Sequence, residues 1–170
     1  MTIRLLVMDV DGTLTDGGIF IGPDGEAMKA FNAKDGYGVK HLLPDAGIEP
    51  MIITGRRSRI LERRAGELGI TALYQGVHDK LPLLRRLMDK RGLDVSEVAY
   101  IGDDLNDLEA IRFAGVSGCP ADATQGIIDV VDYVCRRNGG RAAVREFIEY
   151  LIRLNDDSRG QHQALMPSSR

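Results

Sequence analysis

The sequence has little of what several common classes of protein require. Among its 170 residues are only two cysteines and no tryptophan, and aromatic side chains make up 5% of the chain. Cys119 and Cys135 stand 16 residues apart and match neither a zinc-binding spacing nor a dense disulfide framework. Such cysteine usage fits a reducing compartment, so we expect a cytoplasmic protein.

The sequence also lacks a large excess of charge of one sign and long apolar runs. The formal net charge is −3, from 22 basic and 25 acidic residues, so no broad cationic field is present to hold nucleic acid. The apolar run at residues 3–8 is interrupted at once by Asp9 and Asp11 and is too short for a signal peptide or a spanning helix. We therefore expect no nucleic-acid partner and no membrane association.

Apolar segments and helical patterns alternate along the chain. Short apolar runs at residues 3–8, 51–53, 72–74 and 98–101 are typical of buried parallel strands, and stretches with a helical period separate them. This alternation predicts an α/β protein with a doubly wound parallel sheet, helices on both faces and right-handed crossovers. The length and the 44% apolar content predict one packed domain.

Two segments stand outside this alternation. A strong turn signal at residues 22–25, between short apolar pieces, predicts a β-hairpin over residues 17–32, which we call the flap; a simple edge strand is the alternative. Residues 155–170 lack periodicity and are rich in polar side chains, which predicts a flexible tail after a domain spanning residues 1–154. The spacing between the polar clusters leaves no room for a separate cap domain.

Three of the predicted strands end in polar clusters. Asp9 and Asp11 follow the first strand, Thr54 ends the second, and Asp103 follows the strand at residues 98–101. Because ligands in open α/β sheets bind beyond the carboxyl ends of the strands, we expect these side chains to converge. Converging carboxylates raise one another's pKa unless a cation neutralises them. Oxygen-only ligands favour Mg²⁺ as that cation.

This constellation is suited to phosphoryl transfer. Asp9 can attack phosphorus while Asp11, two residues further on, protonates the leaving oxygen and later activates water. Thr54 and Lys80 are expected to donate to phosphate oxygens, because this chemistry relies on positioning and charge stabilisation. Taken singly, Thr54 is equally well explained as a turn or cap residue and Lys80 as a solvated lysine. A pair of loop acids or a helix cap is the alternative for Asp9 and Asp11, so only the combination indicates catalysis.

In order and spacing these motifs resemble those of the haloacid dehalogenase superfamily. Over residues 6–154 the chain more closely resembles the 3-deoxy-D-manno-octulosonate 8-phosphate phosphatases. The segments that carry this resemblance are residues 15–17, 31–38, 53–56, 73–76, 139–141 and 145–146. Phosphatases of nine-carbon 2-keto-3-deoxy sugar-acid 9-phosphates (KDN or N-acylneuraminate 9-phosphate), and the phosphatase-like domain fused to some acylneuraminate cytidylyltransferases, share much of the pattern.

The resemblance implies a Mg²⁺-dependent phosphatase that hydrolyses 3-deoxy-D-manno-octulosonate 8-phosphate through an aspartyl-phosphate on Asp9. It implies metal ligation by Asp9, by the main-chain carbonyl of Asp11 and by Asp103. Besides Thr54 and Lys80, the expected substrate and phosphate contacts are Asn32, Ala33, Lys34, Asp35, Gly36, Lys40, Gly55, Arg56, Arg64 and Asn106. The relatives are tetramers assembled through their flaps, which implies a homotetramer through residues 17–32 with a neighbour covering each site.

The length of the substrate stays open. Arg56 suits a substrate carboxylate and resembles the eight-carbon enzymes, whereas residues 102–107 and 116–123 more closely resemble the nine-carbon and cytidylyltransferase relatives. A non-catalytic oligomerisation module is an alternative of a different class, and the intact motif residues speak against it. A phosphotransferase or a phosphoprotein phosphatase would keep the chemistry and change the partner.

Overall fold

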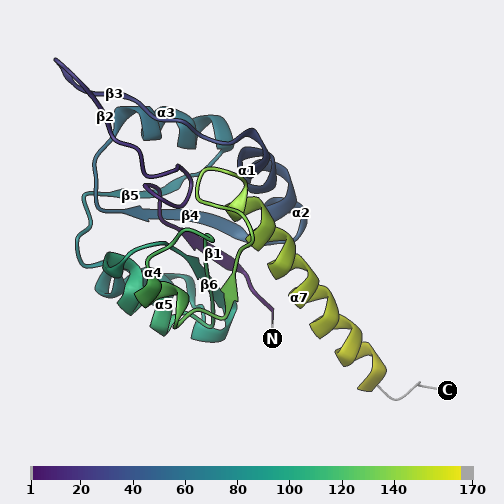
Figure 1. The fold of residues 1–170 in the computed structure, drawn as a ribbon. Helices are drawn as coiled ribbons and strands as arrows, with labels where there is room; N and C mark the ends of the chain where they lie inside the picture. The colour runs from purple at the N-terminus through teal and green to yellow at the C-terminus, as the bar shows by residue number, and fades with distance from the viewer. Residues whose placement is uncertain (1, 166–170) are drawn as a thin grey trace.

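The computed structural model describes residues 2–165, which form a six-stranded parallel sheet between two layers of helices (Figure 1). In sheet order the strands are β5 (Ala72–Gln75), β4 (Glu49–Thr54), β1 (Leu5–Met8), β6 (Val98–Ile101), β7 (Val116–Cys119) and β8 (Tyr133–Val134). The predicted doubly wound α/β fold is confirmed. Strands β7 and β8 have no counterpart among the predicted strands, because β8 has two residues and β7 contains a serine and a glycine.

Strand β1 lies in the middle of the sheet and is buried on both faces. Leu5 and Val7 pack into the core on one side, and Leu6 and Met8 pack into the core on the other. Successive side chains of a strand point to opposite faces, so a strand covered on both sides is apolar throughout instead of alternating. This explains the continuous apolar run at the start of the sequence.

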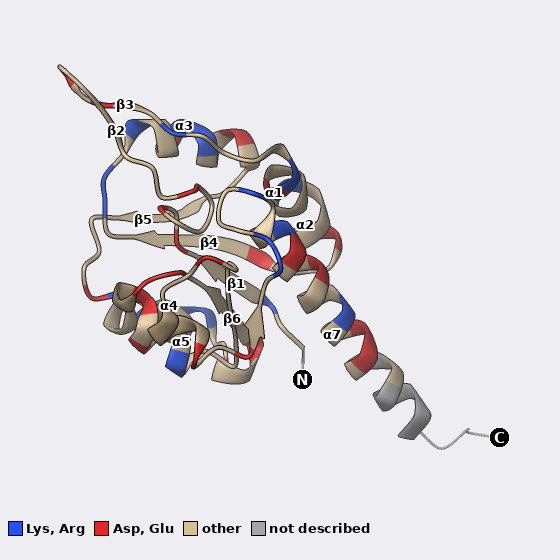
Figure 2. Cartoon of the chain, in the orientation of Figure 1, with Lys and Arg blue, Asp and Glu red and all other residues tan. Residues whose placement is uncertain are grey.

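Helices cover each face of the sheet. One layer contains α1 (Ala33–Tyr37), the π-helical turn η1 (Gly38–Leu42), α2 (Leu43–Asp45), α3 (Arg59–Leu68) and α7 (Ala143–Leu165), and the other contains α4 (Lys80–Arg91), α5 (Leu108–Phe113) and α6 (Gln125–Ile128). Two short 3₁₀ turns, η2 (Val95–Glu97) and η3 (Leu105–Asp107), precede β6 and α5. Basic and acidic residues are interspersed along α3 and α7 (Figure 2). Within the described residues, no helix is both long and apolar enough to cross a bilayer.

The flap is an antiparallel hairpin of β2 (Phe20–Gly22) and β3 (Gly25–Met28), as predicted. It projects from the body of the molecule beyond α3 (Figure 1). Ile21 is 73% exposed and Met28 is 52% exposed, so apolar surface lies on the hairpin in the isolated chain. Within residues 2–165 no separate cap domain accompanies it.

The predicted boundary at residue 154 falls inside helix α7 (Ala143–Leu165). Helix α7 continues to Leu165, through most of the expected tail. Asn155 is buried: its Oδ1 accepts a hydrogen bond from Ile3 N at 2.7 Å, and its Nδ2 donates to Ile3 O at 2.9 Å. Asn155 thus attaches α7 to Ile3, shortly before β1, at a point beyond the apolar pattern of the helix. Residues 166–170 of the expected tail lie outside the described residues.

Candidate active site

The strands β4, β1 and β6 bring their polar clusters together at one edge of the sheet. Met8 of β1 is in register with Ile52 of β4 and Ile101 of β6. Asp9 follows β1 directly, and Thr54 is the last residue of β4. A pocket of about 130 Å³ at this edge of the sheet is lined by Asp9, Asp11, Thr54, Gly55, Arg56, Asp103, Asp104 and Asn106.

Asp9 lines this pocket and is 4% exposed. Burial raises its pKa to about 6; Asp107 adds to the rise and Lys80 opposes it. Asp9 Oδ1 forms a buried ion pair with Lys80 Nζ at 2.9 Å. The ion pair fixes the carboxylate.

Lys80 belongs to a buried network beneath Asp9. Its Nζ donates to Asp107 Oδ1 at 2.6 Å, and the Tyr100 hydroxyl donates to the same oxygen at 2.7 Å. Asp107 Oδ2 accepts from the main-chain N–H of Asp103 at 3.2 Å. Burial by itself lowers the pKa of Lys80, but the carboxylates of Asp9 and Asp107 raise it above its ordinary value. The ammonium therefore stays charged, between Asp9 and Asp107.

Asp103 is placed by the loop that follows β1. Thr13 Oγ1 donates to Asp103 Oδ1 at 2.9 Å. Burial raises the pKa of Asp103 to about 7, and the charge of Asp9 adds to the rise. Gly12 has a φ of +94°, and a Cβ at this position would lie 2.0 Å from Asp103 Oδ2. Only glycine permits both this conformation and this close approach.

The acidic side chains at this point fit a divalent cation. One carboxylate oxygen from each of Asp9, Asp103 and Asp107 lies within 4.8 Å of the other two. Both oxygens of Asp107 already accept hydrogen bonds, which leaves Asp9 and Asp103 as the available carboxylates. The burial of Asp9 and Asp103 and their raised pKa values are the conditions that a hard cation relieves. The carboxylate of Asp11 is not in this group.

The side chain of Asp11 faces the flap. Its Oδ1 is bound by Lys29 Nζ, and its Oδ2 lies 3.7 Å from Arg56 Nε. Lys29 also pairs with Glu26 Oε1 at 3.1 Å, while Glu26 Oε2 accepts a hydrogen bond from Ser58 Oγ. Sequence reasoning missed Lys29 and Glu26. In the sequence they appear as two residues of opposite charge within a predicted hairpin, near a motif expected to be catalytic. Nothing in the pattern showed which way their side chains point.

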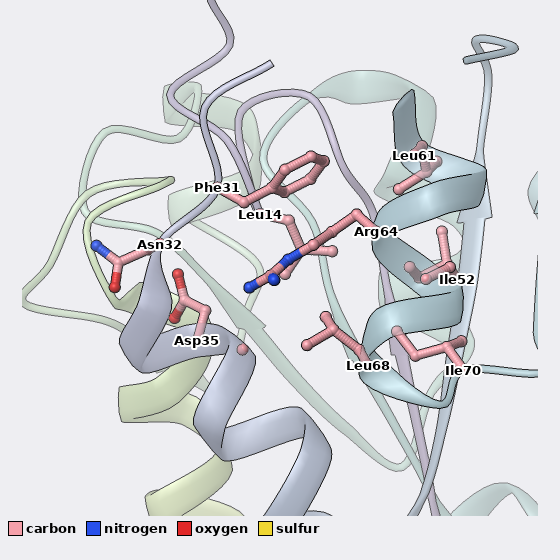
Figure 3. Close-up of a pocket in the computed structure, with 11 residues that line it drawn as sticks. Leu14, Phe31, Asn32, Asp35, Ile52, Leu61, Arg64, Leu68 and Ile70 are labelled. Atoms are coloured by element: carbon pink, nitrogen blue, oxygen red, sulfur yellow. The ribbon is translucent and has the colours of Figure 1, made fainter. Parts of the chain in front are cut away.

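Part of the expected substrate-binding set lies elsewhere. Asn32, Asp35, Gly36 and Arg64 line a separate, mainly apolar cavity of about 10 Å³, which holds no more than a water molecule (Figure 3). Asp35 is 1% exposed, and its Oδ1 accepts from Arg145 N at 2.7 Å. From α3, the Arg64 guanidinium points across the cavity toward Asp35 (Figure 3). In the single chain these side chains are engaged in packing.

The other expected contacts are on the surface. Ala33 is exposed, and Lys34 lines a groove rich in arginine between α1 and the start of α7. Lys40 Nζ donates to Glu67 O at 2.8 Å. Contact of these residues with a substrate stays a prediction.

Comparison with known proteins agrees with the motif pattern. A family model described as haloacid dehalogenase-like hydrolase matches residues 72–148. The 3-deoxy-D-manno-octulosonate 8-phosphate phosphatase KdsC of Escherichia coli K12 is 46% identical over 162 residues, which cover 94% of this chain and 86% of the relative.

Solved structures give the same answer. The 3-deoxy-D-manno-octulosonate 8-phosphate phosphatase of Yersinia pestis superposes with a TM-score of 0.87 at 46% identity, over 93% of this chain and 85% of that one. The corresponding phosphatase of Moraxella catarrhalis, in complex with a magnesium ion, a phosphate ion and a KDO molecule, superposes with a TM-score of 0.87 at 41% identity, over 96% and 94% of the two chains.

Proposed function

This chain belongs to the haloacid dehalogenase-like hydrolases and to their 3-deoxy-D-manno-octulosonate 8-phosphate phosphatases, and we propose that it removes phosphate from that eight-carbon sugar acid. It is a phosphoric monoester hydrolase. The observation that carries the proposal is the convergence of Asp9, Thr54 and Asp103 at the ends of three adjacent strands, in a chain 46% identical to such enzymes.

Two carboxylates carry out the proposed reaction. Asp9 attacks phosphorus, the ester P–O bond breaks, and its electron pair leaves with the sugar oxygen, which takes a proton from the Asp11 carboxylic acid. Water then attacks the aspartyl-phosphate, gives a proton to the Asp11 carboxylate, and the Asp9 carboxylate is released. The sum is phosphate ester plus water to alcohol plus phosphate.

The remaining groups bind and orient the phosphate. Lys80, held by Asp107, presents its ammonium to Asp9, and the Thr54 hydroxyl lines the same pocket. Asp9, Asp103 and the Asp11 carbonyl would hold Mg²⁺. When bound, this ion neutralises the carboxylates and the charge on the phosphoryl oxygens.

Arg56 supports the eight-carbon assignment. Its side chain is 48% exposed at the rim of the pocket, where a cation suits the carboxylate of a sugar acid. The nine-carbon sugar-acid 9-phosphates remain the second candidate because they share this chemistry. Asp104 and Asn106 also line the pocket and belong to the segment that resembles the nine-carbon relatives.

We also propose that the enzyme is a homotetramer assembled through the flap and acts in the cytoplasm. The pocket of about 130 Å³ is smaller than the roughly 300 Å³ or more of typical ligand sites, which supports a site whose walls a neighbouring chain completes. Exposed apolar side chains on the flap, Phe20 and Ile21 among them, supply surface for that contact. Sedimentation of the purified protein, compared with an Ile21→Lys variant, tests the assembly: a monomeric wild type contradicts it.

The test of function is phosphate release at equal concentrations of the eight-carbon 8-phosphate and the nine-carbon 9-phosphates. We expect a kcat/KM preference for the eight-carbon substrate above about tenfold, worth roughly 1.4 kcal/mol, no turnover with a chelator, and none in Asp9→Asn. A phosphopeptide serves as the comparison for a protein substrate. Absence of phosphate release from every sugar phosphate with Mg²⁺ present would contradict the proposal.

A further inference from the structure

We propose that Lys29 of the flap is a positioning residue: it fixes the Asp11 carboxylate and thereby couples the seating of the flap to turnover. The inference rests on the proposed phosphatase function and extends it to a residue outside the motifs that surround the pocket.

The first observation is the burial of Lys29. Its side chain is 2% exposed, although lysine is almost never buried unless it is paired. Its ammonium contacts Asp11 Oδ1 and lies 3.1 Å from Glu26 Oε1. Removing a lysine from water is costly, and two carboxylates compensate that cost here. The side chain is therefore held in one place, against the residue expected to transfer the proton.

The second observation is that the flap is attached on both sides of the pocket. Glu26, in β3, accepts a hydrogen bond from Ser58 Oγ through Oε2. Ser58 is the N-cap of α3 and itself accepts from Leu61 N at 3.1 Å. The flap thus contacts the loop after β1 through Lys29 and the start of α3 through Glu26. A displacement of the hairpin moves the ammonium away from Asp11.

The two cations near Asp11 differ in how closely they contact it. Arg56 Nε lies 3.7 Å from Asp11 Oδ2 on a side chain that is 48% exposed, so it makes a loose contact and is free to turn toward a substrate anion. Lys29 makes the close, buried contact. Orientation of the Asp11 carboxylate is therefore assigned to Lys29, and Arg56 is left for the substrate.

The consequence for catalysis is specific to the proton transfer. When the P–O bond to a sugar breaks, the electron pair stays on a basic alkoxide oxygen, which needs the proton of Asp11. A p-nitrophenolate ion leaves without a proton. Without Lys29 the Asp11 carboxylate reaches its other staggered rotamers, and misplacement by about 1 Å costs up to about 10²-fold in rate.

The experiment compares two leaving groups in single-turnover measurements on the Mg²⁺-loaded enzyme. In Lys29→Met we expect the rate at which the sugar-acid phosphate phosphorylates the enzyme to fall by about tenfold or more. The rate with p-nitrophenyl phosphate should fall by less than about threefold, and KM should be nearly unchanged. In an Asp11→Asn background the Lys29→Met change should have no further effect on either substrate. Lys90→Met, an exposed lysine of α4, is the matched control and should behave as wild type.

Restoring the ammonium separates positioning from folding. Alkylation of Lys29→Cys with 2-bromoethylamine rebuilds a lysine-like side chain through a thioether, and the sugar-phosphate rate should return; treated wild type controls for Cys119 and Cys135. Should Lys29→Met not fold, Lys29→Arg gives the same comparison, because it keeps the charge and moves it.

An equal loss on both substrates, or no loss on the sugar phosphate, overturns the role of Lys29. A wild type that releases no phosphate overturns the proposed function instead.

Discussion

The Lys80 ammonium and the Asp107 carboxylate form an ion pair of 2.6 Å, in which neither side chain is more than 1% exposed. The Tyr100 hydroxyl and the main-chain N–H groups of Asp103 and Asp104 also donate to Asp107. A buried pair is not by itself a source of stability, but removing one partner leaves an uncompensated charge or unpaired donors. This pair therefore determines where the Lys80 ammonium meets Asp9, and its loss should affect both stability and rate.

Asp107→Ala should destabilise the protein by about 3 kcal/mol or more, because Lys80, Tyr100 and two main-chain N–H groups lose an acceptor at once. Urea unfolding measures the change. Glu109→Ala, an exposed acid of α5, is the control and should shift stability by less than about 0.5 kcal/mol. Equal unfolding midpoints for the two variants would contradict the assignment.

Gly12→Ala should lower phosphatase activity by at least about tenfold, because the new Cβ collides with Asp103 and a φ of +94° strains any other residue. Activity with Mg²⁺ and titration of Mg²⁺ by calorimetry are the measurements. Gly66→Ala offers a contrast: it lies inside α3 with no atom within 4 Å of the new Cβ, so it should gain about 0.5–1 kcal/mol. Full activity in Gly12→Ala would refute the close approach.

Stability should depend on the titration of Asp35. Burial raises the pKa of Asp35 to about 6, while main-chain hydrogen bonds, the first from Arg145, oppose the rise. In the unfolded chain the pKa of this aspartate has its ordinary value of about 3.9. At a pH between the unfolded and the folded pKa, the folded state therefore binds more protons than the unfolded state. The stabilisation is complete below pH 4 and is lost as the pH rises through 6, by up to roughly 3 kcal/mol.

The variant Asp35→Asn removes this titration and keeps an acceptor for Arg145 N. From pH 4 to pH 7 the unfolding free energy of the wild type should therefore fall relative to that of the variant. Asp45→Asn, an exposed acid of α2, supplies the baseline. A difference that stays constant over this range would show that Asp35 does not titrate near 6.

Asn155→Ala should cost about 2 kcal/mol, because both the N–H and the carbonyl of Ile3 lose a buried partner at the start of β1. Thermal and urea unfolding measure the loss, with Asp156→Ala on the exposed side of α7 as the control. Truncation after residue 154 should destabilise by a similar amount. A truncated chain as stable as the full chain would restore the predicted boundary at residue 154.

The sequence alone predicted four of the six strands, β5, β4, β1 and β6, and the polar clusters that follow three of them. Each of β1, β4 and β6 is a short apolar run that ends in a polar cluster, and such a run between helical segments is buried on both faces in any parallel arrangement. The polar residues that follow must therefore meet at the carboxyl edge of the sheet. The local sequence pattern was sufficient here because each of these strands is recognised from its own residues alone.

Only the tertiary structure decided the contacts between elements distant in the sequence. Lys29 meets Asp11 across 18 residues, Asp35 meets Arg145 across 110, and Asn155 meets Ile3 across 152. None of these pairs follows from periodicity, since a polar residue looks the same in the sequence whether water or another segment satisfies it. The partner of a buried polar group is chosen by the packing of the whole chain, which is why Arg64 and Asp35 lie in their own cavity and α7 extends past residue 154.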